Sequence, residues 1–247
     1  MFRAKTEKEI EIMRASGKIL KDTLELIGQN IKPGISTYDL DKIAFDYIIS
    51  CGAKPSCLHY QGFPASICTS VDDVVVHGIP RKTQILKEGQ IIGIDICVTY
   101  RGFVTDAART FAVGKISAEK QKLIDVTRES FFEGISGLKA GSRVGDIGAR
   151  VQNYAEKHGM GVVRDLVGHG VGRGLHEEPS IPNYGTAGTG PRLIAGQTIA
   201  VEPMLNLGDY DVVFDGMWDV RTADGKPSAH YENTILITDQ GVEILTI

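Results

Sequence analysis

Five side chains in the last two-thirds of the sequence are of types that bind divalent metal ions. Four are carboxylates in or beside apolar, strand-like runs, and the fifth is an imidazole: Asp95, Asp106, Glu202, Glu232 and His169. A buried carboxylate is costly unless it is paired, protonated or bound to a metal. Several carboxylates with one imidazole form a hard, oxygen-rich donor set for divalent ions. A separate salt bridge or a strand-end turn could explain each acid alone. That explanation has to be invoked once for every acid, which weakens it.

The sequence also repeats itself at a fixed offset. Residues 89–95 (GQIIGID) align with residues 196–202 (GQTIAVE), and an acid closes the segment in both copies. Residues 32–36 align with residues 139–143 at the same offset. Chance similarity among common turn and strand residues is the alternative. A true repeat predicts two similar halves that each deliver a strand-borne carboxylate to one shared centre, as a two-metal site requires.

Composition limits the class of protein. The 247 residues are 42% hydrophobic, enough for one large core, so we expect a single domain over residues 1–247 with halves of about 1–112 and 113–247. A net charge of −4 offers no basic face for nucleic acid. No apolar run approaches the ~20 residues of a membrane span. The first seven residues have no apolar signal core, which predicts a cytoplasmic protein.

The four cysteines show no metal-site or redox spacing. No two of them have CxxC spacing; they are Cys51, Cys57, Cys68 and Cys97. In a reducing compartment they are expected to be free thiols.

Periodicity predicts an α/β chain in which helices and strands alternate. Thr6 and Glu9 form a capping box for a helix that continues to Ile27 at helical spacing, and Ser36 with Asp39 opens a second helix.

The second part of the chain repeats this plan. Further helices are expected near residues 117–136 and 142–158. Gly102 predicts a hairpin between the segments that carry Asp95 and Asp106. We therefore expect one α/β domain with internal pseudo-symmetry and an antiparallel or mixed sheet.

Several motifs in this order resemble the type I methionine aminopeptidases, which have the pita-bread fold. The motifs are VHGIP at 76–80, Asp95 with Asp106 eleven residues later, HGVGRGLHEEP at 169–179, EPM at 202–204 and the segment around Glu232. The resemblance covers essentially the whole chain. It implies an internal pseudo-two-fold repeat of helices over a curved, mainly antiparallel sheet. The sequence lacks the N-terminal zinc-binding extension of the eukaryotic type I enzymes and is similar to the short bacterial form.

The resemblance implies a role for each metal-binding residue. Asp106 and Glu232 would bridge two divalent ions, Asp95 would complete the shell of one ion, and His169 with Glu202 that of the other. The ions could be Co, Mn, Fe, Zn or Ni, because all of these accept this donor set. Such a pair lowers the pKa of a shared water and makes it a nucleophile.

The resemblance also implies the reaction and the partners. The activity would be removal of the initiator methionine from nascent polypeptides whose second residue is small. His77 and His176 would contact the substrate and act in catalysis, and Glu202 could carry a proton to the leaving amine. The protein would be a monomer that acts on nascent chain N-termini, with transient ribosome contact and no specific nucleic acid or membrane partner.

A methionine side-chain pocket is implied at six matching positions: Cys57, Tyr60, Phe63, Cys68, Leu175 and Trp218. Soft and aromatic groups suit a thioether, because sulfur–ring contacts add to burial. These residues could instead be plain core. The sequence departs from the family pattern at Leu175, where an aromatic residue is common. It departs again at His230 and Asn233, where Gln and His are expected, and His230 could alter the hydrogen bonds that orient Glu232.

The spacing of His169 and His176 makes a geometric demand. In a strand, seven residues of separation would put the two side chains on opposite faces. A bend or bulge is then needed to aim both at one cavity, and the glycines at 168, 170, 172 and 174 permit it.

Three other functions remain open. The same fold could carry a proline-directed peptidase, although such relatives usually have an extra N-terminal domain. It could be a non-enzymatic binding protein, although such proteins typically lose metal ligands. A nucleic-acid-binding module is disfavoured by the acidic balance of charge.

Overall fold

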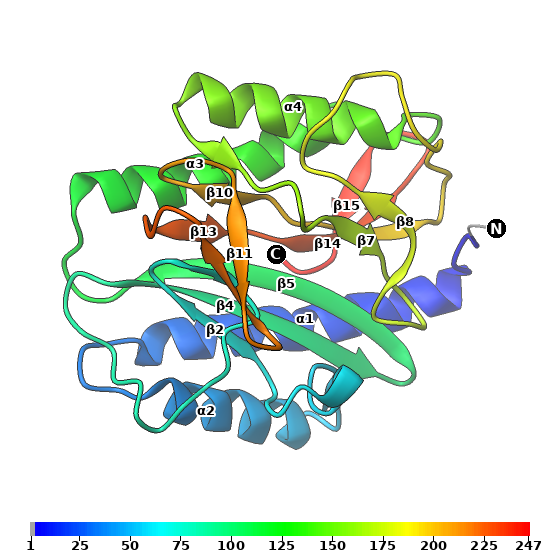
Figure 1. Cartoon of the computed structure of the whole chain (residues 1–247). Coiled ribbons are helices and arrows are strands. Elements are labelled where there is room, and N and C mark those ends of the chain that lie inside the picture. Colours follow the sequence, from blue (N-terminus) through cyan, green and yellow to red (C-terminus); the bar gives the residue numbers. More distant parts are fainter. Residues whose placement is uncertain (1–2) are drawn as a thin grey trace.

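Helices cover two sides of a set of curved sheets in the computed structural model, which describes residues 3–247 (Figure 1). Helices α1 (Glu7–Asn30) and α2 (Thr37–Ser50) lie on one side of the strands, and α3 (Ala118–Ile135) and α4 (Val144–Lys157) on the other. Met1 and Phe2, at the start of the segment expected to carry no targeting signal, lie outside the described residues. Within residues 3–247, no helix is long and apolar enough to cross a bilayer.

The helices begin where the sequence predicts. The Glu9 amide donates to the Thr6 hydroxyl at 3.4 Å, and the Thr6 amide donates to the Glu9 carboxylate at 2.8 Å. Ser36 and Asp39 make the same reciprocal pair at the start of α2. Each box satisfies two amides that have no partner inside the helix. All four predicted helices are confirmed.

The strands form four sheets, and every pairing among the described residues is antiparallel. One sheet has the order β1-β4-β2 with β5 beside β4: β1 (Lys54–Pro55), β2 (Cys68–Val71), β4 (Ile91–Tyr100) and β5 (Phe103–Ala112). A second has the order β15-β14-β9-β7-β8: β7 (Gly168–Gly170), β8 (Glu177–Ile181), β9 (Thr198–Val201), β14 (Asn233–Ile237) and β15 (Val242–Ile244). The expected mainly antiparallel architecture is confirmed.

Two smaller sheets and a short helix complete the fold. The first sheet, β13-β10-β6, consists of β6 (Gly161–Val162), β10 (Met204–Asn206) and β13 (Ser228–His230). The second, β11-β12-β3, consists of β3 (Val74–Val76), β11 (Val212–Asp215) and β12 (Asp219–Thr222). The 3₁₀ helix η1 spans Tyr60–Gly62.

The predicted hairpin is formed by β4 and β5. These ten-residue strands pair along their whole length, from Tyr100 opposite Phe103 to Ile91 opposite Ala112. The two-residue turn between them, Arg101 and Gly102, has φ values of 46° and 81°. Positive φ at both positions matches the right-handed twist of the strands that the turn connects.

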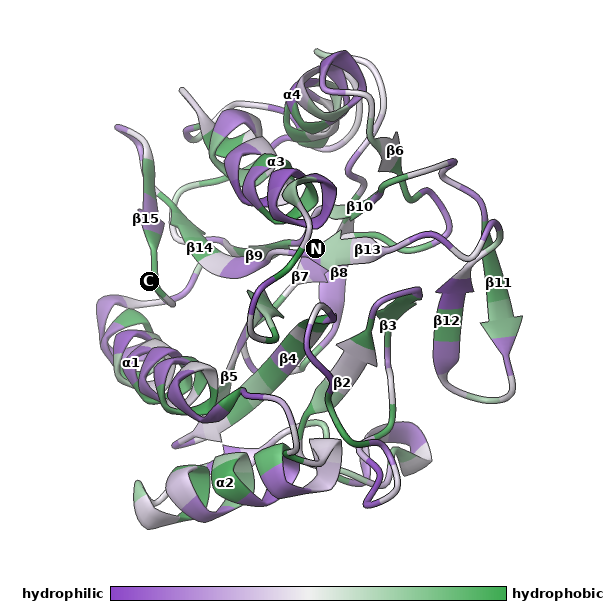
Figure 2. Cartoon of the chain, turned by 90° about the vertical axis from the view of Figure 1, so that its left-hand side faces the viewer, coloured by the Kyte–Doolittle hydropathy of each residue, from purple (hydrophilic) through white to green (hydrophobic). Residues whose placement is uncertain are grey.

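Each helix pair packs on its own apolar cluster. Leu20 and Ile27 of α1 are fully buried against Ile94 and Ile96 of β4. Phe131 of α3 is the largest fully buried side chain of the second cluster, which includes Val151 of α4 and Ile235 of β14. Figure 2 shows β3 and much of β4 as hydrophobic, whereas α1, α2 and α3 carry residues of both kinds. Helices amphipathic in this way bury one face and leave the other in solvent.

Helix α1 approaches the C-terminal segment so closely that a glycine is required. A Cβ placed on Gly17 would lie 1.9 Å from the backbone oxygen of Leu245. No side chain fits there, so Gly17 lets α1 lie directly on the chain that follows β15.

The same backbone contacts occur twice, at positions separated by the offset of the sequence repeat. Ser36 forms a bridge with Ile85, and Arg143 forms one with Arg192. Two backbone bonds recur in the same way, from the Gly34 amide to the Leu86 oxygen at 2.8 Å and from the Gly141 amide to the Leu193 oxygen at 2.9 Å. The segments entering α2 and α4 are therefore held in equivalent ways.

Candidate metal centre and active site

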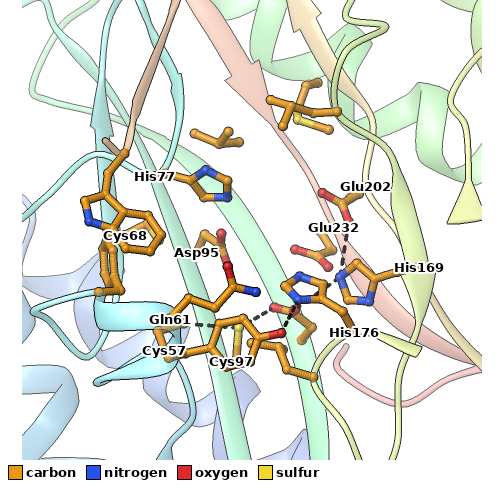
Figure 3. Close-up of a pocket in the computed structure, with 18 of the residues that line it drawn as sticks. Cys57, Gln61, Cys68, His77, Asp95, Cys97, His169, His176, Glu202 and Glu232 are labelled. Atoms are coloured by element: carbon orange, nitrogen blue, oxygen red, sulfur yellow. Dashed lines mark hydrogen bonds and ion pairs between the residues drawn. The ribbon is translucent and has the colours of Figure 1, made fainter. Parts of the chain in front are cut away.

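A cavity of about 210 Å³ brings together all the residues predicted for the site (Figure 3). Its lining contains the predicted metal-binding residues: Asp95, Asp106, His169, Glu202 and Glu232. It also contains the two predicted substrate-contacting histidines and the six predicted pocket residues: His77, His176, Cys57, Tyr60, Phe63, Cys68, Leu175 and Trp218.

The β4–β5 hairpin positions one group of ligand atoms. Asp95 and Cys97 are two residues apart on β4, so their side chains point to the same face of the sheet. Asp106 on β5 lies directly opposite Cys97 in the ladder and shares that face. One ligand atom from each of Asp95, Cys97 and Asp106 lies within 4.8 Å of the others.

The second large sheet delivers the other acids and the imidazole. Glu202 directly follows β9, and Glu232 directly precedes β14, which pairs with β9. His169 on β7 pairs with Ala200 of β9. His169 Nε2 then lies 3.4 Å from Glu202 Oε1 and 3.7 Å from Asp106 Oδ2.

Asp106 connects the two groups. Ligand atoms of Asp106, His169 and Glu232 also lie within 4.8 Å of one another. Between the sheets, the Glu232 amide donates to the Ala108 oxygen at 3.0 Å, and the Ala108 amide donates to the Glu232 oxygen at 3.3 Å. These two bonds join β5 to the start of β14 and so fix the acids of both sheets relative to each other.

The chain reverses between β7 and the antiparallel β8, which brings His169 on β7 and His176, directly before β8, into the same cavity. The β7–β8 ladder shifts register between His169 and Gly170. The rings of His169 and His176 lie 4.3 Å apart between centroids, at a near-perpendicular angle of 74°. The expected bend is confirmed. The Tyr60 hydroxyl lies 2.8 Å from His176 Nδ1 and holds that ring in place.

Burial makes the four carboxyl groups of the cavity resist ionisation. It raises the pKa of Asp95, Asp106, Glu202 and Glu232 well above the usual range, and the neighbouring negative charges add to this effect. Burial also lowers the pKa of His169 to about 4, so the imidazole is neutral at pH 7. A neutral imidazole has a free lone pair for a metal ion.

The chemistry of this donor set fits divalent metal ions. Glu232 Oε1 and Asp95 Oδ1 are buried and have no hydrogen-bond partner among the described residues. Buried acids without partners are costly, and a cation supplies both the partner and the missing charge. The four acids and His169 could therefore hold divalent ions.

The other end of the cavity is apolar and rich in sulfur. A cluster of buried side chains forms this end, and five of its members line the cavity: Cys57, Phe63, Cys68, Cys97 and Leu175. Trp218 packs edge-on against Phe63 with 5.2 Å between ring centroids. At Leu175, where an aromatic residue was expected, the side chain is buried in this cluster and only 8% exposed.

Some lining residues were given no role in the site by the sequence analysis. They are Gln61, Val76, Cys97, Leu166, Val167 and Met204. Strand alternation from Asp95 places Cys97 on the same face, so this residue could have been found. Leu166 and Val167 precede β7 and carry no such signal.

The two departures near Glu232 lie against the predicted metal-binding residues, His230 directly and Asn233 through Arg109. His230 is 3% exposed, and its Nε2 lies 3.8 Å from Glu202 Oε2 and 3.8 Å from Glu232 Oε2. The Asn233 side-chain oxygen accepts a bond from Arg109 at 2.6 Å. The Arg109 guanidinium also donates to the Glu232 backbone oxygen, which fixes the chain at that acid.

The sequence matches a known family over most of its length. The family model described as metallopeptidase family M24 matches residues 11–239. A methionine aminopeptidase of Clostridium perfringens is 51% identical over 248 residues, which cover 100% of this chain and 99% of the relative. The chain belongs to the methionine aminopeptidases of metallopeptidase family M24. This membership confirms the predicted family, the class of enzyme and the use of divalent metal.

Solved structures of methionine aminopeptidases have the same fold. The crystal structure of the enzyme from Rickettsia prowazekii matches with a TM-score of 0.98 and 43% identity over 100% of both chains. The pita-bread fold is thereby confirmed. A Xaa-Pro dipeptidase from Bacillus anthracis matches with a TM-score of 0.80, 24% identity and 61% coverage of that chain, and shares the fold alone.

Proposed function

We propose that this methionine aminopeptidase removes the initiator methionine from nascent polypeptides, preferentially when the second residue is small. The observation that carries the proposal is the single cavity described above. It joins a cluster of acids and one imidazole to an apolar, sulfur-lined pocket. An exopeptidase of this specificity requires a hydrolytic centre, which the acids and the imidazole would provide. It also requires a pocket that selects the side chain of the first residue, which the apolar end would provide.

The metal-binding residues divide into shared and separate ligands in this proposal. Asp106 and Glu232 would be the ligands shared by two divalent ions, because Asp106 belongs to both groups of ligand atoms and Glu232 lies beside it. Asp95 would help to hold one ion, and His169 with Glu202 would help to hold the other. When bound, the two ions supply a water of lowered pKa as the nucleophile.

Three side chains act on the substrate. If Tyr60 donates its hydroxyl hydrogen to His176 Nδ1, the neutral ring keeps its proton on Nε2. His176 can then donate to the scissile carbonyl oxygen as negative charge develops there. Glu202 carries a proton to the leaving amine. His77 lies in the cavity lining and contacts the bound substrate.

The apolar end selects the side chain of the first residue. Phe63, Trp218 and Leu175 supply apolar surface, and the thiols of Cys57 and Cys68 supply soft groups. An unbranched thioether fills such a pocket and gains sulfur–ring contacts. Charged and β-branched side chains are excluded, because they leave buried charge or do not fit.

The setting follows from this substrate. Nascent chain N-termini are the partner in this proposal, which places the enzyme in the cytoplasm; we propose that it acts there as a monomer with transient ribosome contact. Its single domain, residues 1–247, consists of two similar halves of about 1–112 and 113–247. The recurrence of backbone bridges at one offset supports this division.

Two assays test the proposal. Purified protein should release methionine from Met-Ala-Ser, lose this activity in EDTA and regain it with an added divalent ion. In a Met-X-Ser series, Gly and Ala at X should be favoured over Leu and Arg. Full activity in a verified metal-free sample would sink the mechanism. Equal cleavage across the series would remove the small-residue rule, and efficient cleavage of Leu-Ala-Ser would indicate a general aminopeptidase.

The proline-directed alternative has its own readout. Peptides of the form Ala-Pro-Ser should remain uncut under conditions in which Met-Ala-Ser is hydrolysed. Preferential cleavage before proline would replace the proposed substrate.

A further inference from the structure

A thiol lies among the acids at one end of the metal centre. Cys97 is 4% exposed and lies two residues after Asp95 on β4; both are labelled in Figure 3. Asp106 lies opposite Cys97 on β5. The pleat directs all three side chains to one face. No role in the proposed reaction uses this sulfur.

The distances are those of a ligand set. Cys97 Sγ lies 3.1 Å from Asp106 Oδ1. Its sulfur and one oxygen from each of Asp95 and Asp106 all lie within 4.8 Å of one another. Donors about 2.0–2.3 Å from one ion are roughly 3–4 Å apart. Cys97 therefore needs only a small movement to share an ion with these two acids.

Without a cation, the Cys57 hydrogen bond, burial and the neighbouring carboxylates raise the pKa of Cys97, whereas coordination to a metal ion deprotonates a thiol. The Cys57 thiol donates to Cys97 Sγ at 3.2 Å. A hydrogen bond to a ligand sulfur stabilises its negative charge and tunes the metal that it binds. The buried Asp95 Oδ1 has no hydrogen-bond partner among the described residues, and a cation would supply one.

We propose that Cys97 is a sulfur ligand of the ion held by Asp95 and Asp106, and that it biases this end of the centre toward thiophilic ions such as Zn²⁺ over Mn²⁺. Binding replaces the S–H bond of Cys97 with a metal–sulfur bond and releases the proton to solvent. Thiolates select zinc, whereas carboxylates and water suit manganese. The inference rests on the proposed metal centre and adds a donor to it.

Cobalt substitution tests the proposal without measuring activity. Co²⁺ added to metal-free protein should produce visible ligand-field bands together with a near-ultraviolet sulfur-to-cobalt charge-transfer band. Cys97→Ser should lose the charge-transfer band and keep ligand-field bands. Cys57→Ala removes only the donor to the sulfur and should retain the charge-transfer band. Cys51→Ser is the matched control, because Cys51 lies at the end of α2, outside the cavity lining.

X-ray absorption supplies an independent readout on the unmodified chain. Zinc-loaded protein should show one sulfur at about 2.3 Å from the ion, and Cys97→Ser should show none. The ratio of Zn²⁺ to Mn²⁺ affinity should fall at least ~10-fold in Cys97→Ser. Removing even a hydrogen-bond partner of a metal ligand lowers metal affinity by this much.

The outcomes separate the two proposals. Bound cobalt or zinc with no sulfur signal in the unmodified protein overturns the role of Cys97 and leaves the carboxylate centre standing. A charge-transfer band that persists in Cys97→Ser also overturns it. Failure of the unmodified protein to bind any divalent ion overturns the metal centre itself.

Discussion

Removing the Tyr60 hydroxyl isolates one contribution to catalysis. Tyr60→Phe keeps the aromatic ring beside His176, whose centroid is 5.3 Å away, and deletes only the oxygen that lies 2.8 Å from Nδ1. Burial lowers the pKa of His176, so the ring is neutral at pH 7 and its tautomer matters. Without the hydroxyl, Nδ1 no longer has the partner that keeps the proton on Nε2.

The size of the effect follows from the kind of bond that is lost. A neutral hydrogen bond contributes about 0.5–1.5 kcal/mol, which corresponds to roughly a 2- to 13-fold fall in kcat. His176→Ala removes the donor itself and should lower kcat by about 100- to 1000-fold. Because Tyr60 acts through His176, Tyr60→Phe should have no further effect in the His176→Ala background.

The assay is steady-state release of methionine from Met-Ala-Ser for the two single variants and the double variant. Metal content, measured by atomic emission, should be unchanged in all three. Tyr38→Phe, on an exposed tyrosine of α2, is the control and should match the unmodified enzyme. If the losses from Tyr60→Phe and His176→Ala multiply in the double variant, the hydroxyl does not act through His176 and the reasoning fails.

Three further perturbations test other parts of the structure. Asp106→Ala and Glu232→Ala should each weaken both ions in calorimetric titration, whereas Asp95→Ala should weaken mainly one; the reverse pattern would refute the bridging assignment. Gly17→Ala should lower the free energy of unfolding by about 1–3 kcal/mol or more, because its Cβ meets the Leu245 oxygen, while Gly241→Ala, with open space around it, should be neutral in urea denaturation. The amide of Thr6 lowers the pKa of Glu9 to about 2 from 4.5, so stability from this carboxylate is complete above pH 4.5 and lost as the pH falls toward 2. In Glu9→Gln, the urea midpoint should depend less on pH over that range than in the unmodified protein, and Glu25→Gln is the control. An unchanged pH dependence in Glu9→Gln would contradict the assignment.

Local features of the fold could be predicted because local physics determines them. The capping boxes at Thr6 and Ser36 and the hairpin at Gly102 depend on neighbouring residues only. The bulge at His169 was predicted for a different reason: two side chains seven residues apart can share one cavity only if the strand is interrupted. Each of these features was confirmed.

Long-range pairings were beyond a local argument. Nothing near His169 in the sequence specifies that β7 pairs with β9, yet this pairing sets its distance from Glu202. The location of His230 Nε2, equidistant from Glu202 and Glu232, likewise depends on the packing of separate strands. Motif resemblance supplied the grouping of the acids that periodicity could not.

The four acids and the imidazole come from both sides of the chain's midpoint, and this has a thermodynamic consequence. Asp95 and Asp106 stand on the β4–β5 hairpin, whereas His169, Glu202 and Glu232 stand on the sheet built from later residues. An ion bound between them is a cross-link that only the folded chain can offer. At a free concentration of 100 times its Kd, such an ion adds about 2.7 kcal/mol to the unfolding free energy. Loading with metal should therefore protect the enzyme from unfolding and proteolysis, in addition to activating it.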